Sequence, residues 1–378
     1  MDEALTTRVL PAHGGQLSAI AAAFSVPIDR LLDFSASIYP DGPSARVIEA
    51  LSSALRSPEQ LRRYPDLESI ALRANLETYA AVPAGNIVVA NGIVPLMSAS
   101  LRAMQVRRCL LPVPAFGEYR RILERDSIES HTYPLDPTAN FRPDLEHVIE
   151  YCVERGCDSV ILNNPHNPSG GTFAATEMRS ILAHATRRNI RILLDEAFID
   201  FIPEESISSY VLQTDNLIVF RSVTKFFAMA GLRVAYLIAP HSLVATIASL
   251  LDQWCVSTLA SLAAGAAVQD FSYISNTIQS NSAEREWLSR ALAEIGLTVF
   301  PGCANFLLIR LPHEQQGDNA WERLILDHGI VVRNCGTFEG LDGSFMRVAV
   351  RGREDNQRLI RALASVMNRS TQTMRMNS

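Results

Sequence analysis

A lysine in the middle of the chain has neighbours that suit chemistry better than solvent exposure. Lys225 follows an apolar run over residues 217–220, and Arg233 comes eight positions later. Partial burial lowers the pKa of an amine and makes it a nucleophile for carbonyl compounds. Ser222, Thr224 and Arg233 offer donors for a phosphate. A lysine after a strand is usually a solvated surface residue, but this S-x-T-K-x7-R spacing favours a reactive amine beside an anion site.

Two more polar residues follow apolar runs. Asp195 ends the run 192–194, and Asn167 lies in the turn-rich string Asn-Pro-His-Asn-Pro-Ser-Gly after the run 159–162. A carboxylate at the end of a buried strand is costly unless it is paired, and a protonated pyridine nitrogen is a suitable partner. An asparagine amide can donate to a ring hydroxyl. Alone, each residue would fit a helix cap, an ion pair or a plain turn, but their order before Lys225 favours a shared site.

A possible phosphate site and a stacking ring complete the set. Gly92 and Ile93 stand where a predicted helix begins after the run 87–90, and backbone N–H groups at a helix start bind anions. Phe116 can stack on an aromatic ring, although an isolated phenylalanine is more often a core residue. The sequence thus offers an amine, an acid, a hydroxyl partner and phosphate donors. Pyridoxal 5'-phosphate carries the matching aldehyde, pyridine ring, hydroxyl and phosphate, so we expect this cofactor.

The segments that must position these residues alternate between short apolar runs and stretches with helical spacing of apolar residues. Short apolar runs suit strands that are buried on both faces of a mainly parallel sheet. The segment 174–188 between two of them has apolar residues at helical spacing. This alternation predicts an α/β sheet with helices on both faces. The predicted strands are 87–90, 108–111, 159–162, 192–194 and 217–220.

A smaller α+β unit is predicted after the large one. Its expected elements are a helix over 283–294, strands over 297–300 and 306–309, a helix over 321–328, and strands over 330–332 and 345–350. We expect a large cofactor-binding domain over residues 41–283. We expect the small domain to combine residues 1–40 with residues 284–378.

Composition narrows the class of protein. The 378 residues are 48% hydrophobic and 20% charged, which fits a soluble globular protein. The formal net charge of −6 argues against nucleic-acid binding, which usually requires a basic face. Six scattered cysteines without zinc spacing indicate reduced thiols in the cytoplasm and no metal site. The acidic N-terminus lacks the basic and apolar regions of a signal peptide, so we expect none, and no apolar run is long enough to span a bilayer.

Taken together, the strings around Asn167, Asp195, Lys225 and Arg233 resemble those of the fold-type-I pyridoxal-phosphate enzymes, of the class I and II aminotransferase superfamily. The resemblance covers most of the chain and implies the aspartate-aminotransferase fold, with a mainly parallel seven-stranded sheet. The strings are similar to the histidinol-phosphate aminotransferase branch. Tyr64 matches the tyrosine that in this branch reaches the cofactor phosphate of the other subunit, which implies a homodimer with shared active sites.

Within this branch the two ends of the chain are similar to the L-threonine-O-3-phosphate decarboxylases of cobalamin biosynthesis. The similar strings are His-Gly-Gly from His13, Gly329 to Cys335, and Phe338 to Arg351. The resemblance implies that Arg347 binds the substrate carboxylate, that Arg333 binds its phosphate and that His13 lies near the substrate. The planar guanidinium fork of arginine suits both anions.

The sequence departs from this family at several positions. Ser37 and Tyr39 replace two amides in the substrate-facing loop, and Val94-Pro95 stands where the family has an acid after the first helical turn. Phe198 replaces the tyrosine that many aminotransferases carry after the aspartate. These changes leave the predicted cofactor residues intact and bear on the substrate.

We therefore expect a decarboxylase that converts L-threonine O-3-phosphate to (R)-1-amino-2-propanol O-2-phosphate, with Lys225 and Asp195 as catalytic residues. One alternative is an aminotransferase acting on histidinol phosphate or a similar substrate. Another is a decarboxylase of a related phospho- or phosphono-amino acid. A regulator that binds the cofactor as a signal is less consistent with the chain, because such proteins usually carry an added DNA-binding domain.

Overall fold

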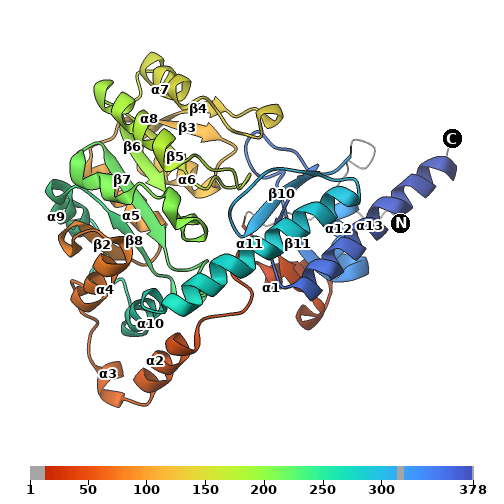
Figure 1. Ribbon diagram of the computed structural model, residues 1–378, viewed down its shortest axis with the longest axis horizontal. Helices are drawn as coiled ribbons and strands as arrows, with labels where there is room; N and C mark the ends of the chain where they lie inside the picture. The colour runs from red at the N-terminus through yellow and green to blue at the C-terminus, as the bar shows by residue number, and fades with distance from the viewer. Residues whose placement is uncertain (1–12, 313–318, 377–378) are drawn as a thin grey trace, which may run out of the picture.

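The computed structural model describes residues 13–312 and 319–376, which form two β-sheets connected by helices (Figure 1). The larger sheet has seven strands in the order β2-β8-β7-β6-β5-β3-β4. Five of them pair in parallel, and β8 is antiparallel to both β2 and β7. This confirms the predicted mainly parallel α/β sheet. The strands are β2 (Ile87–Ala90), β3 (Arg108–Val113), β4 (Glu129–Pro134), β5 (Ser159–Asn163), β6 (Arg191–Asp195), β7 (Leu217–Ser222) and β8 (Ala235–Ile238).

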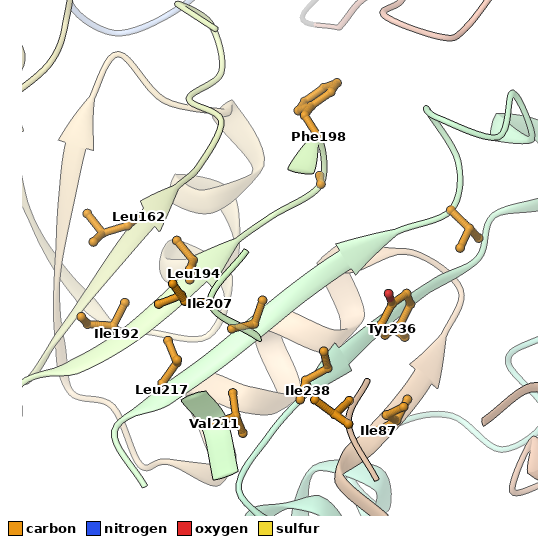
Figure 2. Packing of buried hydrophobic residues seen from close by; sticks show 14 of the residues in the cluster. Ile87, Leu162, Ile192, Leu194, Phe198, Ile207, Val211, Leu217, Tyr236 and Ile238 are labelled. Atoms are coloured by element: carbon orange, nitrogen blue, oxygen red, sulfur yellow. The ribbon is translucent and has the colours of Figure 1, made fainter. Parts of the chain in front are cut away.

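The central strands are apolar because both faces of the sheet are covered. Ile192 and Leu194 of β6 belong to one buried cluster, whereas Leu193 between them belongs to another. Successive side chains of a strand point to opposite faces, so this division places one cluster on each face. Figure 2 shows Ile192 and Leu194 beside Leu217 of the neighbouring strand. Continuous apolar runs therefore predicted β2, β3, β5, β6 and β7, whereas the buried strand β8 was not predicted.

Helices flank this sheet, and several begin at a capping side chain. Ser257 accepts the backbone N–H of Ala260 at the start of α10, and Asp144 accepts that of Glu146 at the start of α7. Such bonds satisfy N–H groups that have no partner within the helix. The helices are α2 (Ala45–Leu55), α3 (Pro58–Arg62), α4 (Ile70–Ala80), α5 (Ile93–Ala103), α6 (Gly117–Arg125), α7 (Leu145–Glu154), α8 (Ala175–Arg187), α9 (His241–Ser249) and α10 (Thr258–Val268).

The second sheet has five strands in the order β1-β11-β12-β10-β9. β1 pairs in parallel with β11, so a strand from the N-terminal part of the chain joins four from the C-terminal part. The strands are β1 (Leu32–Phe34), β9 (Thr298–Val299), β10 (Phe306–Arg310), β11 (Ile330–Asn334) and β12 (Phe345–Ala349). The remaining helices are α1 (Leu17–Phe24), α11 (Phe271–Glu294), α12 (Asn319–His328) and α13 (Arg353–Met376).

Apolar packing ties the N-terminal segment to this second sheet. Ile20 and Phe34 share one buried cluster with Leu324 and Val348. The long helix α11 runs from beside α10 to the smaller sheet (Figure 1). The proposed domain boundaries near residues 40 and 284 stay a prediction, and residues 1–12 of the predicted small domain lie outside the described residues.

Short 3-10 helices connect several of these elements: η1 (Ile28–Arg30), η2 (Ala84–Asn86), η3 (Pro137–Ala139), η4 (Ile199–Phe201), η5 (Pro203–Glu205), η6 (Ser208–Gln213) and η7 (Ala230–Leu232). Within residues 13–312 and 319–376, none of the helices has both the length and the apolar character needed to cross a membrane.

Candidate active site

The predicted cofactor residues gather at one edge of the large sheet. Parallel strands end at the same edge, and ligands of open α/β sheets bind outside these carboxyl ends. Phe116 follows β3, Asn167 follows β5, Asp195 ends β6 and Lys225 follows β7. The register aligns Asn163 at the end of β5 with Asp195. Residues that are far apart in the sequence therefore come together, because they follow strands that end at the same edge of the sheet.

Lys225 is partly buried in this site, and it is the only lysine in the chain. Burial lowers the pKa of its ammonium to about 8, with Asp195 opposing the shift and two arginines adding to it. Its Nζ lies 3.3 Å from Thr224 Oγ1 and 5.4 Å from the centre of the Phe198 ring. A substantial fraction of this amine is therefore neutral and nucleophilic near pH 8.

Asp195 is buried and held at both carboxylate oxygens. Its Oδ1 accepts the backbone N–H of Ala197 at 2.8 Å, and its Oδ2 accepts the hydroxyl of Tyr119 at 2.5 Å. Burial raises the pKa of this carboxyl, and these two hydrogen bonds and Lys225 oppose the rise. A carboxylate can accept about four hydrogen bonds, so Asp195 retains acceptor capacity for a ligand N–H.

The loop after β5 is tied to the end of β6. Asn163 donates its side-chain Nδ2–H to the Asp195 carbonyl at 2.8 Å and accepts the Asn167 backbone N–H at 2.7 Å. His166 crosses from this loop to the loop before α6, since its Nε2 lies 2.9 Å from the Pro114 carbonyl. These contacts hold Asn167 beside Asp195 and bring the Phe116 loop close to both.

Hydroxyl, guanidinium and backbone donors meet where a phosphate was predicted. Gly92 precedes α5 with a φ of +100°, and a Cβ built there would lie 3.0 Å from Arg233 Nη2. The absence of a side chain thus leaves the start of α5 open toward Arg233. Ser222 Oγ and Thr224 Oγ1 are 2.7 Å apart on the turn that leads to Lys225. Ile93 is the first residue of α5.

Two predicted substrate residues lie opposite each other on the small sheet. Arg333 of β11 and Arg347 of β12 are register partners in an antiparallel pair, so their side chains share one face. Both are buried, and burial lowers the pKa of each guanidinium, that of Arg347 to about 10. Arg333 Nη2 donates to Thr337 Oγ1 at 2.6 Å.

Arg347 connects the small sheet with the cofactor loop. Its Nη1 donates to Asn167 Oδ1 at 2.5 Å, and its Nη2 donates to the Ser35 carbonyl at 3.2 Å. Among the described residues, its Nε has no hydrogen-bond partner and its guanidinium forms no ion pair. A buried charge is normally paired, so this guanidinium is suited to bind an anion from outside the chain.

The remaining predicted residues differ in their burial. His13 lies against Phe116 with ring centres 5.8 Å apart, and its Nε2 is 2.8 Å from Glu118 Oε1. Ser37 is buried, and its hydroxyl has no partner within residues 13–312 and 319–376. Tyr64, by contrast, is 80% exposed, and its ring lies against that of Trp254 with centres 4.9 Å apart and an interplanar angle of 33°.

Several residues of this site were missed by sequence reasoning. Tyr119 contacts Asp195, and Glu118 contacts His13. Thr337 contacts Arg333, and Asn163 links two strand ends. The position of Tyr119, three residues after Phe116, was a usable signal, because a residue in the first turn of a helix lies close to the N-cap residue. Another was the lysine count, since the single lysine of the chain falls in the reactive string.

Comparisons with known proteins give a consistent result. The family model "Aminotransferase class I and II" matches residues 29–363. The threonine-phosphate decarboxylase of Salmonella typhimurium is 34% identical over 361 residues, which cover 94% of this chain and 96% of the relative. The histidinol-phosphate aminotransferase structure from Clostridium acetobutylicum has a TM-score of 0.82 at 31% identity, covering 90% of this chain and 100% of that one.

A further solved structure is similar in fold. It is the histidinol-phosphate aminotransferase from Sinorhizobium meliloti in complex with pyridoxal-5'-phosphate, with a TM-score of 0.80 at 21% identity. The alignment covers 88% of this chain and 89% of that one.

Proposed function

Because the chain belongs to the class I and II aminotransferase family, we propose that it is a pyridoxal-phosphate-dependent decarboxylase of L-threonine O-3-phosphate, with (R)-1-amino-2-propanol O-2-phosphate as product. The 34% identity to a threonine-phosphate decarboxylase over nearly the full length of both chains supports this reading. The observation that carries it is Arg347, a buried guanidinium that contacts Asn167 and forms no ion pair with any residue in the described ranges.

The residues present fit the cofactor. Gly92 has no side chain where a Cβ would crowd Arg233, which leaves room for a phosphate beside the start of α5. Asp195 retains acceptor capacity, and Lys225 is the single lysine of the chain. We assign the phosphate to Gly92, Ile93, Ser222, Thr224 and Arg233. Phe116 would cover the ring, Asn167 its hydroxyl and Asp195 its nitrogen.

Each catalytic residue then has a defined task. When bound, pyridoxal phosphate supplies a conjugated pyridine ring that accepts the electron pair left at Cα when carbon dioxide departs. Asp195 would keep a proton on the ring nitrogen by accepting its N–H. Lys225 would hold the cofactor through its amine, and its Nζ would be the group that carries a proton to the substrate Cα. Its lowered pKa suits an amine that must both accept and give a proton.

The substrate residues select the bond that breaks. Arg347 would hold the α-carboxylate, and its contact fixes that guanidinium beside Asn167, the residue that would hold the ring hydroxyl. Arg333, on the same sheet face, would bind the substrate phosphate together with His13. The buried Ser37 hydroxyl supplies a further donor or acceptor from the segment after β1. Two bound anions would fix the Cα–carboxylate bond relative to the ring.

We also propose that the active enzyme is a homodimer. Tyr64 is 80% exposed and its ring lies against Trp254, so its side chain is accessible for the predicted contact with the cofactor phosphate of a second subunit. Large exposed apolar patches usually mark interaction surfaces. Exposed apolar side chains on α2, α3, α4 and nearby segments form such a surface: Ile48, Leu55, Leu61, Tyr64, Leu67, Ile70, Trp254 and Leu262.

A direct assay tests the proposed reaction. The purified protein loaded with pyridoxal phosphate is incubated with O-phospho-L-threonine, and released carbon dioxide and the amine product are measured. Arg347→Lys keeps the charge but loses the planar fork, so we expect turnover to fall at least about tenfold. Arg310→Lys, on a neighbouring strand, is the matched control. Absence of carbon dioxide from the wild-type protein would refute the proposal.

A second candidate activity is transamination of histidinol phosphate. The 31% identity to the histidinol-phosphate aminotransferase structure from Clostridium acetobutylicum favours it, since that alignment covers 90% of this chain. The two activities differ in which bond at Cα is cleaved, and the same residues could serve both. Amino transfer from histidinol phosphate to 2-oxoglutarate, without carbon dioxide release from phosphothreonine, would identify the aminotransferase.

A further inference from the structure

Tyr119 is a buried aromatic residue to which neither the sequence motifs nor the proposed reaction gives a role. It lies on α6 three positions after Phe116, and its side chain is only 2% exposed. Phe116 is the N-cap residue of α6 and Tyr119 lies in the first turn, so both rings come from the start of this helix. The two rings meet edge to face, with centres 5.6 Å apart and an interplanar angle of 86°.

The Tyr119 hydroxyl contacts the acid of the site. It donates to Asp195 Oδ2 at 2.5 Å, while Ala197 N–H donates to Oδ1. One contact thus comes from α6 and the other from the segment that directly follows β6. Together they fix the carboxylate plane and leave acceptor capacity on each oxygen, because a carboxylate accepts about four hydrogen bonds.

The electrostatic balance at Asp195 depends on this hydroxyl. Burial raises the pKa of the Asp195 carboxyl, and the Tyr119 hydrogen bond is the largest of the causes that oppose the rise. Burial and the Asp195 charge raise the pKa of Tyr119 well above its usual value, so the phenol remains protonated and donates. Donation to the charged form of an acid favours that form.

We propose that Tyr119 is a positioning residue, whose hydroxyl fixes the charge and orientation of Asp195 toward a ligand N–H and whose ring supports Phe116. This inference rests on the cofactor placement in the proposed function, with the ring nitrogen at Asp195. Tyr119 does not touch the reacting atoms. It acts through the acid at the end of β6 and through the stacking ring at the start of α6.

Binding of two different ligands can distinguish this positioning role from a role in packing alone. The cofactor-free protein is titrated with pyridoxal phosphate and with an analogue in which a C–H group replaces the ring nitrogen. In Tyr119→Phe the packing stays and the hydroxyl is lost. We expect the affinity for pyridoxal phosphate to fall about tenfold, which equals a loss of about 1.4 kcal/mol in binding free energy. The affinity for the analogue should change less than about twofold.

The matched control is Tyr79→Phe. Tyr79 also donates to a buried aspartate, Asp200, at 2.7 Å, but that aspartate pairs with Arg221 outside the predicted cofactor residues. We expect this variant to leave the ratio of the two affinities unchanged. A second test, in an Asp195→Asn background, removes the charge on which Tyr119 acts, so adding Tyr119→Phe should change that ratio less than about twofold.

The outcomes are distinct. Equal losses for both ligands, or no loss for either, would overturn the role of Tyr119 and leave the proposed decarboxylase intact. Failure of the wild-type protein to bind pyridoxal phosphate would overturn both proposals. Absence of carbon dioxide release would overturn the proposed reaction alone, because neither titration depends on turnover.

Discussion

At the scale of single residues, the positive groups of the site outnumber its one acid. Arg233 and Arg347 both lower the pKa of Lys225. Asp195 is the acid that opposes this shift. Such an arrangement is unfavourable in the cofactor-free protein and becomes favourable when a phosphate and a carboxylate bind. Ligand binding and the stability of the folded chain should therefore be linked.

The charge of Lys225 leads to a prediction about the stability of the cofactor-free protein. Its pKa is about 8 in the folded chain, against 10.5 as the ordinary value. Between these values the unfolded chain binds more protons, so stability rises with pH across this window. At pH 7 the cofactor-free protein therefore bears the cost of a buried ammonium. We expect cofactor-free Lys225→Met to have a higher free energy of unfolding than the wild type at pH 7, with a smaller difference near pH 10.

Urea unfolding at both pH values measures this difference. The single lysine makes the comparison clean, since no other lysine titrates in the same range. A variant that is less stable than the wild type at pH 7, or a difference that does not change with pH, would contradict the predicted cost of the ammonium.

At the scale of elements, two loops carry the site and His166 joins them. Its Nδ1 lies 2.7 Å from Ser169 Oγ within its own loop, and its Nε2 lies 2.9 Å from the Pro114 carbonyl. A neutral imidazole can donate from Nε2 while it accepts at Nδ1. Burial lowers the pKa of His166 to about 4, so this neutral form persists in the folded chain down to acidic pH.

The pairing of these loops predicts an acid-sensitive step. Between pH 6.5 and 4 the unfolded chain protonates His166 but the folded chain does not, so stability falls as pH decreases, by up to about 1.4 kcal/mol per pH unit. In His166→Asn this contribution is absent, and the fall in unfolding free energy between pH 6.5 and 4.5 should be shallower. Denaturant titrations at several pH values measure the slope.

The control for this prediction is His147→Asn. His147 is exposed on α7, and its replacement should leave the slope as in the wild type. If His166→Asn and the wild type lose stability equally over this pH range, His166 is not buried as a neutral link between the loops.

At the scale of the whole molecule, many of the exposed apolar residues belong to α2, α3, α4 and the segments between them. α2 and α3 extend away from both sheets at the lower edge of Figure 1 and bear part of this surface. Tyr64 lies two residues beyond the end of α3 and Trp254 follows α9, yet their rings lie against each other. A two-fold dimer would cover the same patch on both chains and bring each Tyr64 to the other site.

Hybrid dimers test the shared site. Subunits with Lys225→Ala are mixed with subunits carrying Tyr64→Ala after dissociation, and the dimers are allowed to reform. In each hybrid, one site combines an intact Lys225 with an intact Tyr64 from the other chain. Random pairing makes half of the dimers hybrid, and one of the two sites in each hybrid is intact. We therefore expect the mixture to exceed the mean activity of the two parent variants by about a quarter of the wild-type activity.

Mixing Lys225→Ala with Lys225→Met is the control, since neither chain can supply the amine. Activity no higher than the mean of the Lys225→Ala and Tyr64→Ala parents would show that Tyr64 acts in its own subunit or not at all. Light scattering on the wild-type protein provides the mass of the assembly independently.

Much of the fold could be predicted from the sequence because strands that are buried on both faces consist of apolar residues. β5, β6 and β7 are apolar on both faces, so continuous apolar runs revealed them. β4 was missed because Glu129–Pro134 is a half-exposed edge strand, and its polar residues carry little strand signal. β1 was missed because three residues are too few to form a pattern, and only its pairing with β11 defines it.

By itself the sequence determined the cofactor chemistry, because a reactive lysine, an acid and phosphate donors stand in order at the ends of predicted strands. Only the tertiary structure decided which groups support them. Tyr119 meets Asp195 across 76 positions and Arg347 meets Asn167 across 180. Such contacts depend on how helices and sheets pack, and local sequence patterns hold no information about partners so far apart in the chain.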